Sequence, residues 1–153
     1  MLQPQINGHP RAIVGAPTAR FRQCGESDVP WLMEMARHHY GPAMADPQGV
    51  LLWIRSVLTH PQCLAYRAEE AVVVAMAGRT FFDPSASQAR VLFFAGEVWE
   101  VVSLLRIAAH WARRVHGMPL WFTDDTGRDI AVLARRLKAK AVPPTPPAYL
   151  IGG

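Results

Sequence analysis

A strand–helix–strand pattern between Arg90 and Phe122 constrains the fold of this chain more than any other stretch. The compact apolar run that ends at Gly96 has the length and composition of a buried strand, and a second apolar run spans Leu120 to Phe122. Between them, apolar side chains recur at the spacing of one helix face, at Val101, Leu104, Leu105, Ala108, Ala112 and Val115. Parallel strands need a crossover of this kind, so the pattern predicts a βαβ unit.

The carboxyl end of the predicted helix is marked by its own signals. Arg113, Arg114 and His116 place basic side chains where the helix dipole favours them. Gly117 suits the position after the last helical residue, and Pro119 prevents the helix from continuing. The helix is therefore expected to stop just before the second strand.

The rest of the sequence extends this unit to a mixed α+β domain. Further strands are predicted at Ala19–Cys24, Cys63–Arg67 and Ala71–Ala77, with a weak edge strand at Tyr149–Ile151. Ala71–Ala77 is apolar on both faces, as a central strand should be. Helices are predicted from Ser27 or Asp28 to His39, from Asp46 to Leu58, from Glu97 to His116 and from Asp124–Thr126 to Leu137. The result is a mixed central sheet of about six strands flanked by about four helices.

The two ends of the chain differ from this domain in composition. Residues 1–19 contain three prolines, two glycines and one charged side chain, which predicts an extended N-terminal arm rather than a folded element. Residues 143–153 begin with a proline cluster and contain the weak edge strand. The folded domain is therefore expected at residues 20–142.

Composition excludes several classes of protein. Half of the 153 residues are hydrophobic and 18% are charged, which fits a globular domain with its own core. No apolar run reaches the roughly 18–20 residues that a membrane span requires. The first residues lack the basic and apolar regions of a signal peptide, which predicts cytoplasmic synthesis and no secretion. Cys24 and Cys63 have neither CxxC nor metal-ligand spacing, so two reduced thiols and no metal site are expected.

The net charge of +4 collects in the second half of the chain. The basic residues there include Arg106, Arg113, Arg114, Arg128, Arg135, Arg136, Lys138 and Lys140. Such a cluster could serve an anionic ligand, a nucleic-acid surface or an acidic partner. A solvated helix face is the default interpretation, so nucleic-acid binding is a minor hypothesis that the charge does not exclude.

The predicted order of elements resembles the fold of the GCN5-related N-acetyltransferases, the GNAT superfamily, over roughly residues 20–151. The segments that carry the resemblance are the opening strand and helix start at Arg22–Leu32, the central third strand at Ala71–Ala77, the long helix at Leu104–Gly117 and the fifth strand at Leu120–Phe122. The resemblance implies acetyl-CoA as cofactor. Its pyrophosphate would be held by the backbone N–H groups of a loop with the pattern Arg/Gln-x-x-Gly-x-Gly/Ala, just before the long helix.

The sequence departs from that loop pattern at the matching position, which reads Gly96, Glu97, Val98, Trp99 and Glu100. This stretch has one glycine, no arginine or glutamine in register, and bulky side chains where the backbone would approach phosphate. The two carboxylates favour a helix cap and repel a diphosphate, each by about 0.3–1 kcal/mol. We therefore expect a degenerate loop without cofactor-binding residues.

The family's acid–base residues are also not matched. Many members place a tyrosine on the last helix to protonate the departing thiolate, but the corresponding stretch Asp129–Leu137 contains none. Tyr149 lies beyond the proline cluster. Glu97 is the one candidate for a general base, because a carboxylate at the end of the fourth strand can accept an amine proton. A helix cap is the default interpretation for this residue, so no catalytic residue is assigned.

Two functional hypotheses follow. In the first, the chain is a non-catalytic GNAT-like structural or assembly protein, without a cofactor, that contacts other protein subunits through its arm and through aromatic side chains such as Trp53 and Trp99. Degenerate proteins of this size resemble those encoded among bacteriophage virion genes, so a virion component is its concrete form. In the alternative, the chain is an acetyl-CoA-dependent N-acetyltransferase with an atypical cofactor loop.

Overall fold

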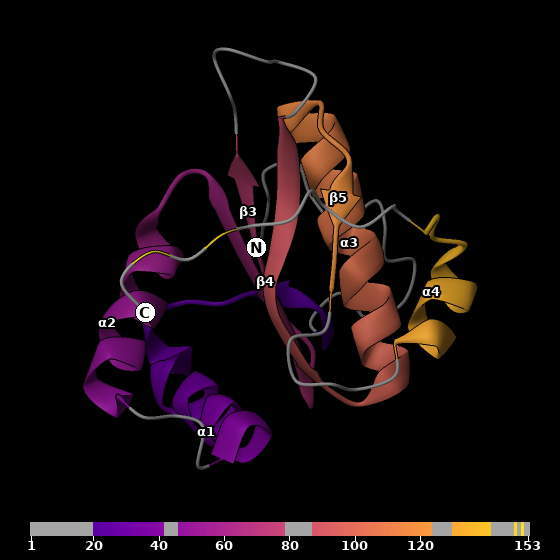
Figure 1. Ribbon diagram of the computed structural model, residues 1–153. Helices are drawn as coiled ribbons and strands as arrows, with labels where there is room; N and C mark the ends of the chain where they lie inside the picture. The colour runs from indigo at the N-terminus through magenta and orange to yellow at the C-terminus, as the bar shows by residue number, and fades with distance from the viewer. Residues whose placement is uncertain are drawn as a thin grey trace.

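The computed structural model describes residues 20–41, 46–78, 87–123 and 130–141, together with Tyr149 and Ile151. These residues form a five-stranded sheet in which neighbours in sequence are neighbours in space (Figure 1). The strands are β1 (Arg22–Gln23), β2 (Cys63–Arg67), β3 (Ala71–Gly78), β4 (Gln88–Gly96) and β5 (Leu120–Trp121). The first four strands are antiparallel, whereas β4 and β5 are parallel. This mixed sheet confirms the predicted fold class.

Helices cover both faces of the sheet. They are a short 3-10 helix η2 (Glu26–Asp28), then α1 (Val29–Tyr40), α2 (Pro47–Thr59), α3 (Val98–His116) and α4 (Ala131–Leu137). In Figure 1, α1 and α2 lie on one face of the sheet, and α3 and α4 lie on the other. The predicted beginning of α4 at Asp124–Thr126 lies outside the described residues, as does the predicted arm at residues 1–19.

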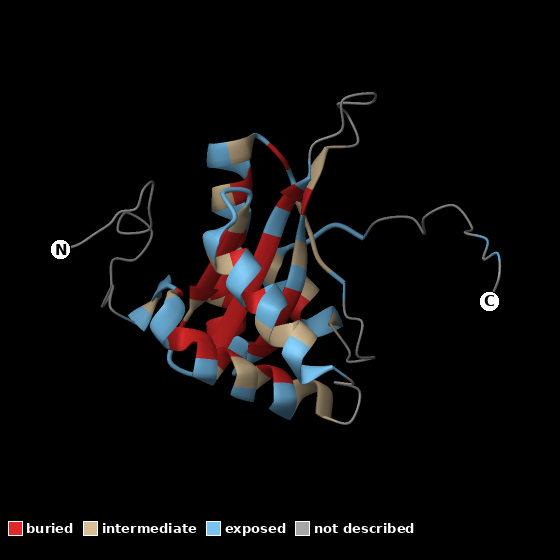
Figure 2. Cartoon of the chain, turned by 90° about the vertical axis from the view of Figure 1, so that its left-hand side faces the viewer, coloured by how far each residue is buried: buried red, intermediate tan, exposed pale blue. Residues whose placement is uncertain are grey.

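Strand β3 supplies both layers of the hydrophobic core. Val72 and Val74 pack with α1 and α2, whereas Ala71 and Val73 pack with α3 and α4. Successive side chains of a strand point to opposite faces, so a strand buried on both sides must be apolar throughout. Figure 2 shows the buried residues running through the sheet and along the inner faces of the helices. The prediction of a central strand from Ala71–Ala77 is confirmed.

Helix α3 completes the predicted βαβ unit. Its inner residues Leu104 and Ala108 are inaccessible to solvent. Gly117 ends it in the left-handed conformation, at φ 66°, and donates its N–H to the carbonyls of Ala112 and Arg113. Val115 was expected on the buried face, but it is exposed, while Met118 after the turn is buried instead.

Two further expectations concern the thiols and the C-terminal segment. Cys24 and Cys63 are both free thiols, and no group of His, Cys, Asp or Glu among the described residues could hold a metal ion. None of the helices that the structure describes is long and apolar enough to cross a membrane. Tyr149 and Ile151 are highly exposed and stand outside the described sheet, and the rest of the weak edge strand lies outside the described residues.

Candidate functional site

The strands β4 and β5 separate soon after they meet. They pair only at Ala89 with Leu120 and at Arg90 with Trp121. The remainder of β4, from Val91 to Gly96, has no strand beside it on that edge among the described residues. An unpaired strand edge presents backbone N–H and C=O groups that an extended ligand can bind. The parting of the two strands therefore creates a candidate site along β4.

A β-bulge lies in this part of β4. Val74 of β3 pairs with Phe93, whereas the next residue, Ala75, pairs with Val91. Leu92 is therefore an extra residue without a partner on β3, and such a residue bends its strand and increases the local twist. The bulge lies two residues beyond Arg90, the last residue paired with β5, so it bends β4 where the two strands part.

The turn from β4 into α3 is fixed by a close approach of two backbones. Gly96 has a φ of 117°, and a Cβ built on it would lie 2.1 Å from the carbonyl oxygen of Glu70. The N–H of Glu97 donates to that same carbonyl over 3.1 Å. The close approach of the β2–β3 turn therefore requires a glycine at this position.

The first backbone N–H groups of α3 are occupied by the chain itself. The Glu97 side chain accepts a hydrogen bond from the N–H of Trp99 over 2.9 Å and another from the N–H of Glu100 over 3.2 Å. Each carboxylate oxygen of Glu97 therefore has a partner. This confirms that Glu97 caps the helix. The capping contacts place a negative charge where an anionic ligand would otherwise bind.

Glu100 in the same turn is only 5% exposed, which the sequence did not indicate. Its carboxylate accepts a hydrogen bond from the N–H of Glu70 over 2.8 Å and forms an ion pair with Arg20 over 3.1 Å. A buried carboxylate needs partners of this kind to offset the loss of solvation. Glu100 thus joins α3 to the β2–β3 turn and is not available to a ligand.

The neighbouring Val98 and Trp99 point outward. Trp99 is exposed, and the guanidinium carbon of Arg136 on α4 lies 3.7 Å from the centre of its ring. Arg106 of α3 donates a hydrogen bond to the Arg136 carbonyl over 3.0 Å. These contacts hold α4 against the start of α3. Arg106 and Arg136 belong to the basic residues in the second half of the chain, and they lie on a solvated helix face.

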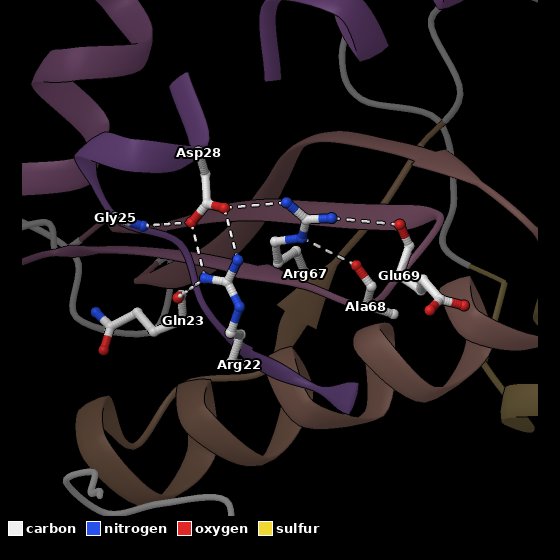
Figure 3. Close-up of polar contacts among 7 residues, drawn as sticks. All are labelled: Arg22, Gln23, Gly25, Asp28, Arg67, Ala68 and Glu69. Carbon is white, nitrogen blue, oxygen red and sulfur yellow. Dashed lines mark hydrogen bonds and ion pairs between the residues drawn. The ribbon is translucent and has the colours of Figure 1, made fainter. Parts of the chain in front are cut away.

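A second polar cluster lies on the other side of the β2–β3 turn, around Asp28 (Figure 3). Arg22 binds both oxygens of this carboxylate over 2.7 and 2.8 Å, Arg67 binds it over 3.0 Å, and the N–H of Gly25 donates over 2.8 Å. The hydrogen bonds from Arg22 contribute most to lowering the pKa of Asp28 to about 2, although burial opposes them. The guanidinium of Arg67 also stacks on Trp31, 3.5 Å from the ring centre.

This cluster is structural. Arg22 and Arg67 face each other across β1 and β2, where two like charges would repel, and Asp28 lies between them. The sequence predicted a helix cap at Ser27 or Asp28 and indicated neither arginine; the contact between Asp28 and Arg67 joins residues 39 positions apart. The cluster fixes the start of α1 against the sheet, and Asp28 is bound by both arginines.

An apolar cavity of about 380 Å³ lies between the sheet and the pair α1 and α2. Ala65, Val74 and Phe93 belong to its sheet side. Tyr40 lines it near the end of α1, and its ring centre lies 5.6 Å from that of Phe93. Leu92, the bulge residue of β4, lines it as well. The cavity therefore reaches the part of β4 that has separated from β5.

The architecture of this chain is similar to that of known proteins. No protein-family model matches the sequence, and no curated protein matches it in a search by sequence. Among solved structures, the chain is similar to an aminoglycoside antibiotic 6'-N-acetyltransferase from Acinetobacter haemolyticus, with a TM-score of 0.67 at 12% identity over 87% of this chain and 97% of that one. It is also similar to an aminoglycoside 6'-N-acetyltransferase from Acinetobacter baumannii, with a TM-score of 0.65 at 12% identity over 87% and 98%.

A third similar structure is an aminoglycoside acetyltransferase from an uncultured soil metagenomic sample, in complex with sisomicin. It has a TM-score of 0.58 at 13% identity over 86% of this chain and 94% of that one. Similarity at this level of identity establishes the fold. The chain thus has the fold of the GNAT acetyltransferases, as the order of its predicted elements indicated.

Proposed function

We propose that the chain is an acetyl-CoA-dependent N-acetyltransferase with an atypical cofactor loop. The observation that carries the proposal is that, among the described residues, β5 pairs with β4 only at Ala89 and Arg90, on a fold shared with acetyltransferases. The amide groups of a pantetheine arm can pair with such a strand edge as an added strand would. When bound, acetyl-CoA would supply an activated acetyl group.

The diphosphate of the cofactor fits less well than the pantetheine arm. The Glu97 carboxylate accepts hydrogen bonds from the N–H groups of Trp99 and Glu100. These are the N–H groups at the start of α3 to which a diphosphate would otherwise bind. Glu97 is exposed, so its side chain can rotate away, but losing a helix cap costs about 1 kcal/mol. We therefore expect acetyl-CoA to bind with lowered affinity, and Glu97 to act against binding rather than as the general base.

A second candidate function is favoured by this same capping contact. If the side chains of Glu97 and Glu100 keep these contacts, the start of α3 connects the helix to the sheet and binds no cofactor. The chain is then a non-catalytic assembly protein. Trp53 and Trp99 are exposed and would contact other protein subunits. This hypothesis further predicts membership of a bacteriophage virion and cytoplasmic synthesis.

Calorimetric titration with acetyl-CoA distinguishes the two functions. The wild-type protein is compared with Glu97→Gln, which keeps a capping side chain and removes its charge, and with Glu69→Gln, which removes an exposed carboxylate from the nearby β2–β3 turn. We expect Glu97→Gln to bind acetyl-CoA about two- to fivefold more tightly than wild type, and Glu69→Gln to bind like wild type. If neither wild type nor Glu97→Gln binds acetyl-CoA, the enzymatic proposal is wrong and the assembly role is favoured.

A further inference from the structure

The apolar cavity has the properties of a small-molecule site. Its volume of about 380 Å³ lies within the range typical of ligand pockets and is too small for a helix or a strand pair. Its inner lining includes Leu32 and Ile54, which are buried, together with Ala65 and Val74 of the sheet. An apolar ring or a short alkyl chain would remove mainly apolar surface from water there.

One end of the cavity carries a negative charge. Asp46, which begins α2, is exposed and is the single charged side chain among the described residues that line the cavity. One of its oxygens, Oδ1, accepts the N–H of Gly49 over 3.0 Å as a helix cap. Among the described residues, no hydrogen bond to the other oxygen, Oδ2, is formed. A carboxylate in this position can bind one ammonium group.

We propose that this cavity binds a small apolar primary amine, with its hydrocarbon body against the sheet and its ammonium group at Asp46. That the amine is also the acetyl acceptor rests on the proposed acetyltransferase function: after loss of one ammonium proton to solvent, the amine nitrogen would form the C–N bond as the thioester C–S bond breaks, and coenzyme A would leave as its thiol with the second amine proton. The cavity adjoins the bulge at Leu92, so an amine held there lies beside the part of β4 that follows its pairing with β5. The binding itself requires only the cavity and the carboxylate.

The same lining argues against the ligands of the similar structures. An aminoglycoside such as sisomicin, which occupies one of them, carries several ammonium groups and several hydroxyl groups. The described lining offers it one carboxylate and a largely apolar wall, and the whole chain carries a net charge of +4. A polycation would leave most of its charges unpaired in this cavity. The geometry therefore selects a monocation with an apolar body.

Direct binding of 2-phenylethylamine, measured by calorimetry without cofactor, tests the inference. The comparison ligands are 2-phenylethanol, which has the same body without the charge, and sisomicin. We expect the amine to bind about three- to tenfold more tightly than the alcohol, and sisomicin to bind least well. Equal binding of amine and alcohol, or tighter binding of sisomicin, would overturn the proposal.

Two pairs of variants locate the binding. Asp46→Asn keeps the helix cap but removes the charge, so it should abolish the preference for the amine over the alcohol. Glu34→Gln removes a charge from α1 away from the cavity lining and should leave that preference unchanged. Val50→Phe adds bulk to the cavity lining on α2 and should weaken binding at least tenfold. Leu52→Phe, on the exposed face of the same helix, should not. Binding that survives both Asp46→Asn and Val50→Phe, with the fold checked by thermal unfolding, would exclude this cavity.

The outcomes separate this inference from the proposed function. If the amine binds as described but acetyl-CoA does not bind, the cavity is an amine site and the acetyltransferase proposal is wrong. If acetyl-CoA binds and the amine does not, the acceptor class is wrong while the enzyme remains. If both bind, formation of N-acetyl-2-phenylethylamine, detected by mass spectrometry, shows that the bound amine is an acceptor, and its absence shows that it is not.

Discussion

Arg22 and Asp28 form a bidentate ion pair in which the guanidinium binds both oxygens of the carboxylate, over 2.7 and 2.8 Å. Asp28 is 3% exposed, and Arg67 and the N–H of Gly25 also bind it. The contact connects β1 to the turn that begins α1. Its geometry makes Asp28 the polar residue on which the pH dependence of stability should depend most.

Replacing Asp28 with Asn should therefore remove a pH-dependent part of the stability. The pKa of Asp28 is lowered from 3.8 to about 2, so its contribution is present above pH 3.8 and is lost as the pH falls through about 2. The shift corresponds to about 2 kcal/mol at neutral pH. Urea unfolding from pH 7 to pH 2 should show this loss in the wild type and not in Asp28→Asn. Glu34→Gln, which breaks an exposed ion pair with Arg37, should resemble wild type.

Gly96 should tolerate no side chain. In Gly96→Ala, the new Cβ would collide with the Glu70 carbonyl at 2.1 Å, and the φ of 117° is strained for any other residue. We expect a loss of about 3 kcal/mol or more in the free energy of unfolding. Gly25→Ala is the matched control, because its Cβ would meet no atom within 4 Å. A mild effect of Gly96→Ala in thermal unfolding would show that the β2–β3 turn can move aside.

Replacing a leucine with alanine should destabilise the protein strongly in the core beneath α3 and only slightly on the outer face of α2. Leu104 is fully buried between α3 and the sheet, so Leu104→Ala should cost about 2–5 kcal/mol of stability. Leu52 on α2 is exposed, and Leu52→Ala should change the stability by less than about 0.5 kcal/mol. Chemical unfolding of both variants provides the measurement. Similar losses for the two would contradict the described packing.

The two thiols should react at different rates. Burial raises the pKa of Cys24 to about 12, and burial also raises the pKa of the half-buried Cys63. Because the thiolate is the reactive form, both should react slowly with a disulfide reagent at pH 8, with Cys63 reacting first. Cys24 should react only when the chain unfolds. Rapid modification of Cys24 in native protein, located by mass spectrometry of the labelled peptides, would show that β1 opens readily.

Most of the fold was predictable because its signals are local. The helical spacing of Leu104, Ala108 and Ala112, together with the stop at Gly117, predicted α3 and the parallel strand that follows it. The unbroken apolar run of Ala71–Ala77 predicted a central strand. These properties depend on neighbouring residues and on the two-sided burial of a strand, so a single sequence contains them.

The polar contacts were less predictable, because they join distant parts of the chain. Glu97 was recognised as a helix cap from its place before Val98, but the burial of Glu100 depends on Arg20 and on the Glu70 backbone, 80 and 30 positions away. The bulge at Leu92 is likewise visible only once β3 is aligned against β4. The apolar cavity follows from how α1 and α2 lie on the sheet, which no sequence pattern describes.

The two-residue pairing of β5 has a consequence for how the protein opens. Strand β3 is hydrogen-bonded on both sides and buried on both faces, so its amide protons should exchange with solvent only on global unfolding. The amides of β5 are held by a very short ladder and should exchange through local fluctuation at far lower free energy. β5 can therefore move away from β4 while the core stays intact.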